Sequence, residues 1–441
     1  MRSKRLSLLA TAAVLALGAV PSAFAQNLRE LYEAARAFDA TYLAAQAQAR
    51  SAEYRAAQAD ALFRPSASVS AGATAGYVDA DSRPGGDSNT LSATLQGRYP
   101  LFNKANDASA EQARKALMLA QADLASAEQD LIVRVAQAYF DVLAAQDTLE
   151  TTRAAKAATS EQLASAKRAF EVGTATITDT REAQSRYDLD VAREIAADND
   201  LRAKRIALDQ VVGRPSVQPN PLALPVALPP VLPADPEAWV ATADAQHPTI
   251  QRAQAALEIA QLEIDRAKAA DALTLDAVAS VGAAKYSGKY PNGVPGSPTT
   301  TASIGVQFSM PLYTGGATAN RISETVALEE KARNDLAAAR RGVAQATRVA
   351  YFGVQSGSAQ VKALEAAEAS TKLALEATQL GYKVGVRVNL DVLNAQSQLY
   401  QTQRDLARAR YDVLVGNLRL RQAAGQLSPG DIDAINALLA K

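Results

Sequence analysis

The sequence predicts a mainly α-helical chain with a β-barrel contribution, built from one structural unit that occurs twice. Three observations support this prediction: an internal repeat, long stretches without Gly or Pro, and four stretches in which apolar and polar residues alternate. Of the 441 residues, 48% are hydrophobic but only 5% are aromatic. Much of the apolar content is alanine, so the chain forms long, closely packed helices more readily than a bulky globular core.

The internal repeat has an offset of 211 or 212 residues. Residues 171–187 match residues 383–400, and within them Asp179 falls on Asp391. Further matches follow in the same order along both halves, which indicates a tandem duplication. Each unit begins with an alanine-rich helical segment and continues through two strand-like stretches around a polar loop. It ends in two helices joined by a Val-Gly turn.

The predicted helices are unusually long. Residues 103–172 contain no Gly or Pro, and a continuous helix there would be on the order of 100 Å long. Such a rod must lie against other rods in a coiled-coil-like layer. Gly173 permits a reversal in the first unit, and Gly381 and Gly385 do so in the second. The second long helix also contains three glycines that permit either a bend or close packing: Gly342, Gly353 and Gly357.

Four segments have the period of two that is typical of strands. In 90–101 and 301–312 an apolar face alternates clearly with a polar face, and 66–78 and 274–286 alternate less regularly. These lengths suit barrel strands that cross a membrane in about 9–11 residues, although a sandwich with one wet face is an alternative. Open sheet edges cannot face lipid, so four strands per chain would require oligomerisation: a dimer supplies eight strands and a trimer twelve.

The boundaries of the predicted domains follow from these features. Residues 1–25 resemble a signal peptide, with a positive start, an apolar stretch and Ala23-Phe24-Ala25 as the cleavage site; an uncleaved anchor is the alternative. A linker with eight prolines between Pro215 and Pro236 must wrap on the helices or stay mobile. The predicted order is signal peptide 1–25, first repeat 26–213, linker 214–248, second repeat 249–425, and a tail 426–441 that belongs with the linker.

The composition excludes several classes of function. Without the three cations of residues 1–25, the chain has 43 basic and 46 acidic residues, which gives no reason to expect nucleic acid as a partner. The chain has no Cys, so disulfides, thiolate metal sites, a cysteine nucleophile and a lipid on an N-terminal Cys are excluded. The one histidine, His247, precedes Pro248 at a predicted helix start and is expected to be structural. We therefore expect neither an enzyme nor a cofactor.

The segments that end the strands and join the helices resemble those of the TolC family of outer-membrane efflux proteins. They are Tyr99–Phe102, Met310–Tyr313, and the hairpin tips 172–179 and 381–393. The resemblance implies a homotrimer with a twelve-stranded barrel in outer-membrane lipid and an α-helical tunnel across the periplasm. It also implies docking on a periplasmic adaptor (membrane fusion) protein that connects to an inner-membrane transporter. Toxic compounds, or proteins in type I secretion, would pass through without chemistry.

The resemblance also assigns roles to residues of the tips. Tyr382 and Arg387 match the pair that holds the family's iris shut, and Thr178 and Asp179 match their partners on the neighbouring hairpin. Asp391 matches an acidic ring at the narrowest point. Asn394 stands where the family has a second acid, so the ring should be less negative here. The expected adaptor-docking residues are Val172, Gly173, Thr174, Val384, Gly385 and Val386.

Simpler alternatives exist for these residues and for the whole chain. Asp179 and Asp391 could be helix N-caps, Arg387 a solvated charge, and Tyr382 a packed side chain. A soluble periplasmic coiled-coil scaffold would account for the signal peptide and the helices but not for the alternating strands. An outer-membrane barrel enzyme would need a nucleophile and a base, which the sequence does not supply.

Overall fold

The structure, a computed structural model, describes residues 26–80, 83–223, 225–226, 228–289 and 297–440. The expected signal peptide, 1–25, lies outside the described residues. The chain divides into two units. Among the described residues, the tip unit comprises those within 26–43, 128–239 and 347–440, and the sheet unit those within 44–127 and 240–346.

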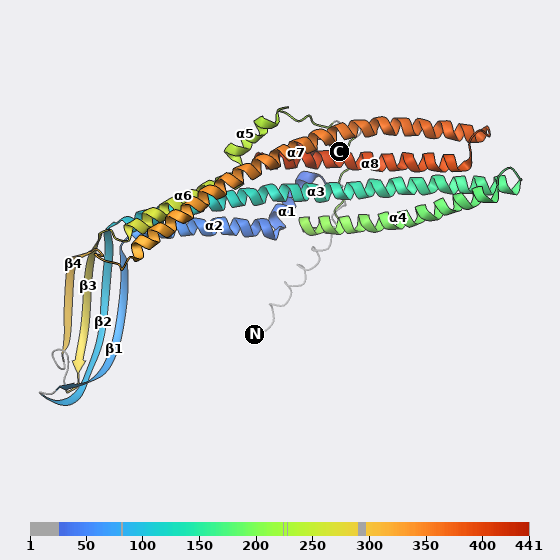
Figure 1. The fold of residues 1–441 in the computed structure, drawn as a ribbon. Coiled ribbons are helices and arrows are strands. Elements are labelled where there is room, and N and C mark those ends of the chain that lie inside the picture. The colour runs from blue at the N-terminus through green and yellow to red at the C-terminus, as the bar shows by residue number, and fades with distance from the viewer. Residues whose placement is uncertain (1–25, 81–82, 224, 227, 290–296, 441) are drawn as a thin grey trace, which may run out of the picture. The chain divides into compact units, whose positions relative to one another are not determined.

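The sheet unit contains four antiparallel strands in the order β1-β2-β3-β4 (Figure 1). The expected strand 301–312 stops earlier than predicted, because Pro311 has no N–H to continue the ladder. The second strand begins earlier than the expected residue 90. The bounds are β1 Ser66–Ala80, β2 Arg83–Asn103, β3 Thr274–Ser287 and β4 Pro298–Ser309.

The two faces of the sheet differ in polarity. Opposite residues of antiparallel strands share a face, so each row across the sheet can be followed from the register. One row consists of the apolar residues Val69, Leu95, Val281 and Ala302. The next row consists of Ser70, Thr94, Gly282 and Thr301. Val69, Leu95 and Val281 are all more than half exposed in the single chain, so the apolar face is uncovered.

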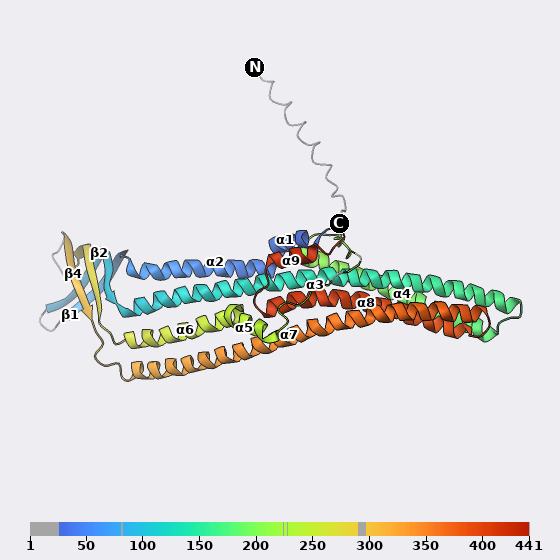
Figure 2. The same ribbon diagram turned by 90° about the horizontal axis from the view of Figure 1, so that it is seen from above.

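Helices lie side by side in the rest of the sheet unit, as Figure 2 shows for α2, α3, α6 and α7. Gln112 of α3 donates to Glu263 of α6 at 2.8 Å, and Arg321 of α7 reaches the same carboxylate. Burial acts to raise the pKa of Glu263, but these bonds and one from Arg266 lower it to about 2. His247 is the N-cap of α6 and accepts from the Thr249 N–H. The helices are α2 Ala40–Asp60, α3 Lys104–Glu171, α6 Pro248–Ala269 and α7 Ala317–Lys383, after the short η1 Ala61–Phe63.

The tip unit contains the far parts of α3 and α7 and the two helices that return from them. α3 and α7 are 68 and 67 residues long, in agreement with the predicted rods. The returning helices are α4 Ile177–Val212 and α8 Asn389–Ala423, and the shorter helices of this unit are α1 Leu28–Phe38 and α9 Pro429–Asn436. α5 Pro236–Gln246 begins in the tip unit and continues in the sheet unit. Within the described residues, the structure contains no helix that is both long and apolar enough to cross a membrane.

An apolar core joins the hairpins within the tip unit. Phe140 of α3 stacks on Tyr411 of α8 with ring centroids 5.6 Å apart. A side chain at Gly357 of α7 would approach Val413 of α8 to 2.9 Å, so close packing accounts for this glycine. Each large side chain buried here stabilises the fold by about 1.5–3 kcal/mol. The buried positions of α3 recur at helical spacing: Leu131, Ile132, Val135, Ala136, Tyr139, Phe140 and Leu143.

The proline-rich linker lies on the helices of the tip unit. Trp239 is buried in a cluster with Tyr351 and Val354 of α7 and Leu406 of α8, and Leu228 and Val231 of the linker pack against this cluster. Both ends of the described chain also bond to the linker. Gln26 donates its N–H to the Gln218 carbonyl at 2.8 Å, and Ala440 donates to the Pro221 carbonyl at 2.8 Å. The linker therefore wraps on the helices, which was one of its two predicted alternatives.

Candidate gate at the helical hairpin tips

The two hairpins end in turns with the same backbone. We call residues 168–180 the first tip and residues 380–392 the second tip. Gly173 and Gly385 each have φ of 81°, a left-handed conformation that glycine adopts without strain. In both tips the N–H after this glycine bonds to the carbonyl five residues earlier, at 2.8 Å in the first and 2.9 Å in the second. This pattern is that of a Schellman motif, which satisfies carbonyls at a helix end.

The six residues expected to dock an adaptor are all exposed at these turns: Val172, Gly173, Thr174, Val384, Gly385 and Val386. The three valines are each about two-thirds exposed or more. Burying such side chains against a partner removes apolar area from water, which favours association. The tips therefore present apolar surface at the ends of the hairpins.

The first tip contains a capping box. Thr176 is the N-cap of α4, and its hydroxyl accepts from the Asp179 N–H at 3.2 Å. In return, Asp179 Oδ2 accepts from the Thr176 N–H at 2.9 Å and from its hydroxyl at 2.7 Å. Thr178 is exposed between them. Asp179 is thus the third residue of a capping box, and the alternative that it is itself the N-cap is wrong, because Thr176 holds that position. The Thr-x-x-Asp spacing would have predicted this box from sequence.

The second tip has no such box. Its N-cap is Val388, which makes no side-chain capping bond, so the alternative that Asp391 is an N-cap is wrong. Arg387 instead forms an ion pair with Asp391 at 3.7 Å, and 61% of the Arg387 side chain is exposed. Gly381 provides the space for this arginine, since a Cβ there would lie 2.8 Å from Arg387 Cγ. Tyr382 is half-buried beside it.

The structure therefore separates the predicted gate residues into two groups within one chain. Arg387 meets Asp391 and not Asp179, while the Asp179 carboxylate bonds to Thr176. The N–H and the hydroxyl of Thr176 both donate to Asp179 Oδ2. No donor among the described residues bonds to Asp179 Oδ1. A lock between Arg387 and Asp179 would have to form between hairpins of different chains.

The two hairpins of one chain are joined at the tips by polar contacts that sequence reasoning missed. Asn389 is 1% exposed, and its Nδ2 donates to the Asp179 carbonyl at 3.3 Å. Its Oδ1 accepts from Gln162 Nε2 of α3. Arg186 of α4 donates to Asn394 Oδ1 at 2.8 Å. A small apolar cluster lies beside these bonds: Leu163, Ala166, Ala183 and Leu393, with Tyr187 partly buried against it.

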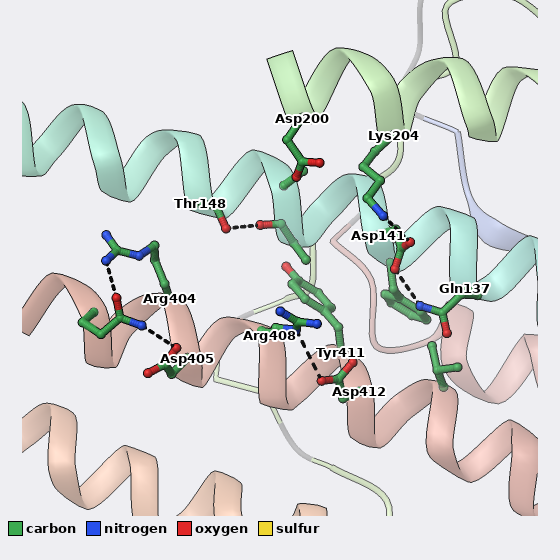
Figure 3. Close-up of a pocket in the computed structure, with 15 residues that line it drawn as sticks. Gln137, Asp141, Thr148, Asp200, Lys204, Arg404, Asp405, Arg408, Tyr411 and Asp412 are labelled. Atoms are coloured by element: carbon green, nitrogen blue, oxygen red, sulfur yellow. Dashed lines mark hydrogen bonds and ion pairs between the residues drawn. The ribbon is translucent and has the colours of Figure 1, made fainter. Parts of the chain in front are cut away.

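Farther along the tip unit, a cavity of about 490 Å³ lies among α3, α4 and α8 (Figure 3). Two ion pairs lie among its charged side chains. Lys204 donates to Asp141 at 3.0 Å, and Arg408 lies 3.8 Å from Asp412. Tyr411, which lines the cavity, donates to Asp147 at 2.6 Å, and burial raises the pKa of both groups. Among the described residues, no cluster of His, Asp or Glu could hold a metal ion.

Comparison with known proteins assigns this chain to a family. The model of the outer membrane efflux protein family matches residues 31–214 and 239–426. The chain belongs to the outer membrane efflux protein family. The outer membrane protein TolC of Vibrio cholerae is 34% identical over 425 residues, which are 96% of each chain. The alkaline protease secretion protein AprF of Pseudomonas aeruginosa is 32% identical over 359 residues, 80% of this chain and 73% of its own.

Solved structures of this family have the same fold. The outer membrane protein VceC of Vibrio cholerae superposes with a TM-score of 0.77 at 21% identity, over 90% of this chain and 96% of its own. The predicted fold class, mainly helical with long coiled-coil helices and β-hairpins in a duplicated unit, is therefore confirmed. The outer membrane efflux protein family is one of channels in the outer membrane that extend into the periplasm. The predicted location is confirmed, and the alternative of a soluble periplasmic scaffold is set aside.

Proposed function

We propose that three copies of this chain form an outer-membrane exit duct for a tripartite efflux pump or a type I secretion system. The observation that carries this proposal is the four-stranded sheet with an uncovered apolar face. Within the described residues, β1 and β4 each pair on one side only. Lipid cannot satisfy the free edges, so closure must come from further copies. Three copies supply the twelve strands of the family's barrel, with lipid against the Val69–Leu95–Val281 row and water against the Ser70–Thr94 row.

The tips form the gate of this duct. In the trimer, Arg387 and Tyr382 of one chain face Thr178 and Asp179 of a neighbouring chain. Two features support this: the Arg387 guanidinium is mostly exposed and only loosely paired, and Asp179 Oδ1 has no donor among the described residues. An arginine and a phenol donating to one carboxylate form a charge-assisted contact, but solvent keeps it modest. A modest contact suits a gate, because an adaptor must be able to break it.

Asp391 and Asn394 line the narrowest ring beyond this lock. Asn394 is neutral and already accepts a hydrogen bond from Arg186, so only Asp391 contributes charge. We expect weaker binding of cations than in a ring with two acids per chain. The tip valines meet an adaptor protein, which connects the duct to an inner-membrane transporter. The duct itself performs no catalysis.

The choice between efflux and protein secretion rests with the pump and the adaptor. The relative named for alkaline protease secretion supports the secretion branch, and the name of the family supports the efflux branch. The tips and the sheet serve both branches in the same way. The proposal therefore includes both toxic compounds and secreted proteins as substrates.

Single-channel conductance of the purified mature protein in a planar bilayer tests the proposal. We expect a small, steady conductance that rises when Tyr382→Phe and Arg387→Ser are combined, because both lock contacts are lost. Lys383→Ser is the matched control: it removes a neighbouring cation of the second tip and should leave the conductance unchanged. No conductance from a well-folded sample would overturn the duct. Conductance that is unchanged in the double variant would overturn the lock alone.

A further inference from the structure

The polar face of the sheet bears two charged side chains among neutral ones. On β2 the neutral residues precede Arg98 and are Ser88, Thr90, Ser92, Thr94 and Gln96. On β3 the same face contains Asp276, which lies diagonally across from Arg98. From the row of Asp276 to that of Thr90, the described part of the polar face has no other charged residue. Lys285 of β3 lies on the apolar face, because it pairs with Leu91.

Arg98 and Asp276 form an ion pair whose two ends differ in exposure. Arg98 Nη2 donates to Asp276 Oδ2 at 2.6 Å, and 57% of the arginine side chain is exposed against 7% of the aspartate side chain. Asp276 Oδ1 is buried and has no hydrogen-bond partner among the described residues. A buried carboxylate oxygen without a donor destabilises the fold, so stability alone is a poor explanation for the pair. The pair presents its positive end on the polar face.

The guanidinium of Arg98 has further donors available. It carries five N–H groups in a fixed fork, and within the described residues its side chain makes one hydrogen bond, to Asp276. Ser66, which is opposite Arg98 on β1, bonds to the backbone carbonyl of Arg98 at 3.4 Å and not to its side chain. Carboxylate and phosphate groups match the guanidinium fork with two parallel hydrogen bonds. Asp276 therefore orients the guanidinium and leaves N–H groups for such an anion.

We infer that Arg98, oriented by Asp276, forms a ring of three guanidinium groups that binds carboxylate and phosphate groups inside the trimeric barrel. The inference rests on the proposed duct, in which the polar face lines a water-filled lumen and each of three copies contributes one arginine. The lining around the ring is neutral and rich in hydroxyl groups, so the arginines set the sign of the local potential. Asp276 is a positioning residue, since its carboxylate is buried beside the guanidinium.

This ring and the ring proposed at the tips carry opposite charges. Asp391 attracts cations at the tips, whereas Arg98 attracts anionic groups in the sheet unit. Rings of charged side chains decide which ions a pore favours. A substrate with a carboxylate or phosphate group would gain a transient contact in the barrel that a neutral substrate lacks. The ring thus gives the duct a preference of its own, in addition to that of the pump and the adaptor.

The first test measures ion selectivity in planar bilayers with a KCl gradient. The parent protein and the variant with Tyr382→Phe and Arg387→Ser are each compared with the same protein carrying Arg98→Gln. We expect Arg98→Gln to lower the ratio of chloride to potassium permeability about threefold at about 0.01 M salt, where the screening length is about 30 Å. The matched control is Lys285→Gln, which removes a cation from the apolar face of the same sheet and should leave the ratio unchanged.

The second test separates an effect of charge from an effect of structure. Asp276→Asn removes the negative charge beside the ring and should raise the permeability ratio, whereas Arg98→Gln should lower it. Arg98→Lys keeps the positive charge and should retain most of the ratio. If the pair only holds β2 and β3 together, Arg98→Gln and Asp276→Asn shift the ratio in the same direction or not at all, which overturns the ring. If Arg98→Gln does not assemble, the rise expected for Asp276→Asn decides the test.

The third test measures anion binding directly with tripolyphosphate, which is added to each side of the bilayer in turn. We expect it to reduce the current through the variant with Tyr382→Phe and Arg387→Ser. The concentration that halves the current should rise about tenfold when Arg98→Gln is added, because charge-assisted hydrogen bonds are lost. At about 1 M salt the screening length falls to about 3 Å, so the block should weaken with Arg98 in place.

The outcomes distinguish the ring from the duct. No conductance from well-folded parent protein means that the proposed duct has failed. If the protein conducts, an unchanged permeability ratio in Arg98→Gln, or an equal block by tripolyphosphate, overturns the ring while the duct survives. The ring is also overturned if Lys285→Gln shifts the ratio as much as Arg98→Gln does, because the polar face would then not line the lumen.

Discussion

Between the first tip and the second, equivalent backbone hydrogen bonds differ in length by no more than 0.1 Å, yet the side chains around them differ in kind. The first tip closes its helix with Thr176 and Asp179, while Val388 leaves the second helix without a side-chain cap. The second tip instead has a glycine that accommodates an exposed arginine. Duplication kept the turn and changed its chemistry, so the first tip is capped by its own side chains and the second presents an exposed arginine.

The largest expected effect tests whether the two backbones are equivalent. Gly173→Ala and Gly385→Ala should each lower the free energy of local opening by about 1–2 kcal/mol, because alanine is strained at positive φ. Neither position has an atom within 4 Å of the added Cβ, so the backbone alone sets the loss. Amide hydrogen exchange at each tip measures it. Unequal losses would show that the turns differ in more than their side chains.

A smaller effect tests the capping box. Thr176→Ala should lower the opening free energy of the first tip by about 1 kcal/mol, because the Asp179 N–H loses the hydroxyl that accepts from it. Hydrogen exchange of the amides at the start of α4 measures the change. The matched variant Val388→Ala removes no capping bond and should change the second tip by less than about 0.5 kcal/mol. Equal effects at the two tips would contradict the asymmetry.

The smallest expected effect comes from a variant that makes the capping of the second tip more like that of the first. Val388→Thr gives the second tip a hydroxyl at its N-cap, with Asp391 three residues later as in the first tip. We expect the start of α8 to gain about 0.5 kcal/mol against local opening. Asp391 would then accept from the introduced hydroxyl as well as from Arg387, which should loosen the ion pair. Exchange that is no slower than in the parent protein would mean that the backbone at residue 388 cannot present the hydroxyl.

The sequence predicted the fold well because its signals were periodic and repeated. A stretch without Gly or Pro predicted the end of α3 to within a few residues, and Gly173 allows the reversal there. Gly385 allows the reversal after α7, but Gly381, from which a reversal was also expected, lies inside that helix. The strand bounds were less accurate. β2 begins at Arg83, well before the regular alternation starts, because pairing with β1 continues into the polar loop.

The tip contacts could not be predicted because they depend on three-dimensional register between the hairpins. Nothing local shows that Asn389 faces Gln162, or that Asn394 accepts from Arg186, since each pair is more than 200 residues apart in sequence. The one signal in the sequence for these contacts was a difference between the repeats: Asn389 is polar, whereas the corresponding residue of the first repeat, Ile177, is apolar. The roles of Tyr382, Arg387, Thr178 and Asp391 in a gate are still proposals, because they concern contacts between chains.

The linker that holds both ends of the described chain has a topological consequence. Gln26 pairs with Pro219, and Leu439 pairs with Leu222, so the two ends are attached three residues apart on the same segment. Tyr139 of α3 fastens that segment by donating to the Asn220 carbonyl at 2.9 Å. A circular permutant that joins the two ends and opens the chain elsewhere could keep every one of these bonds. Conversely, a single protease cut between residues 219 and 222 would untie both ends from each other at once.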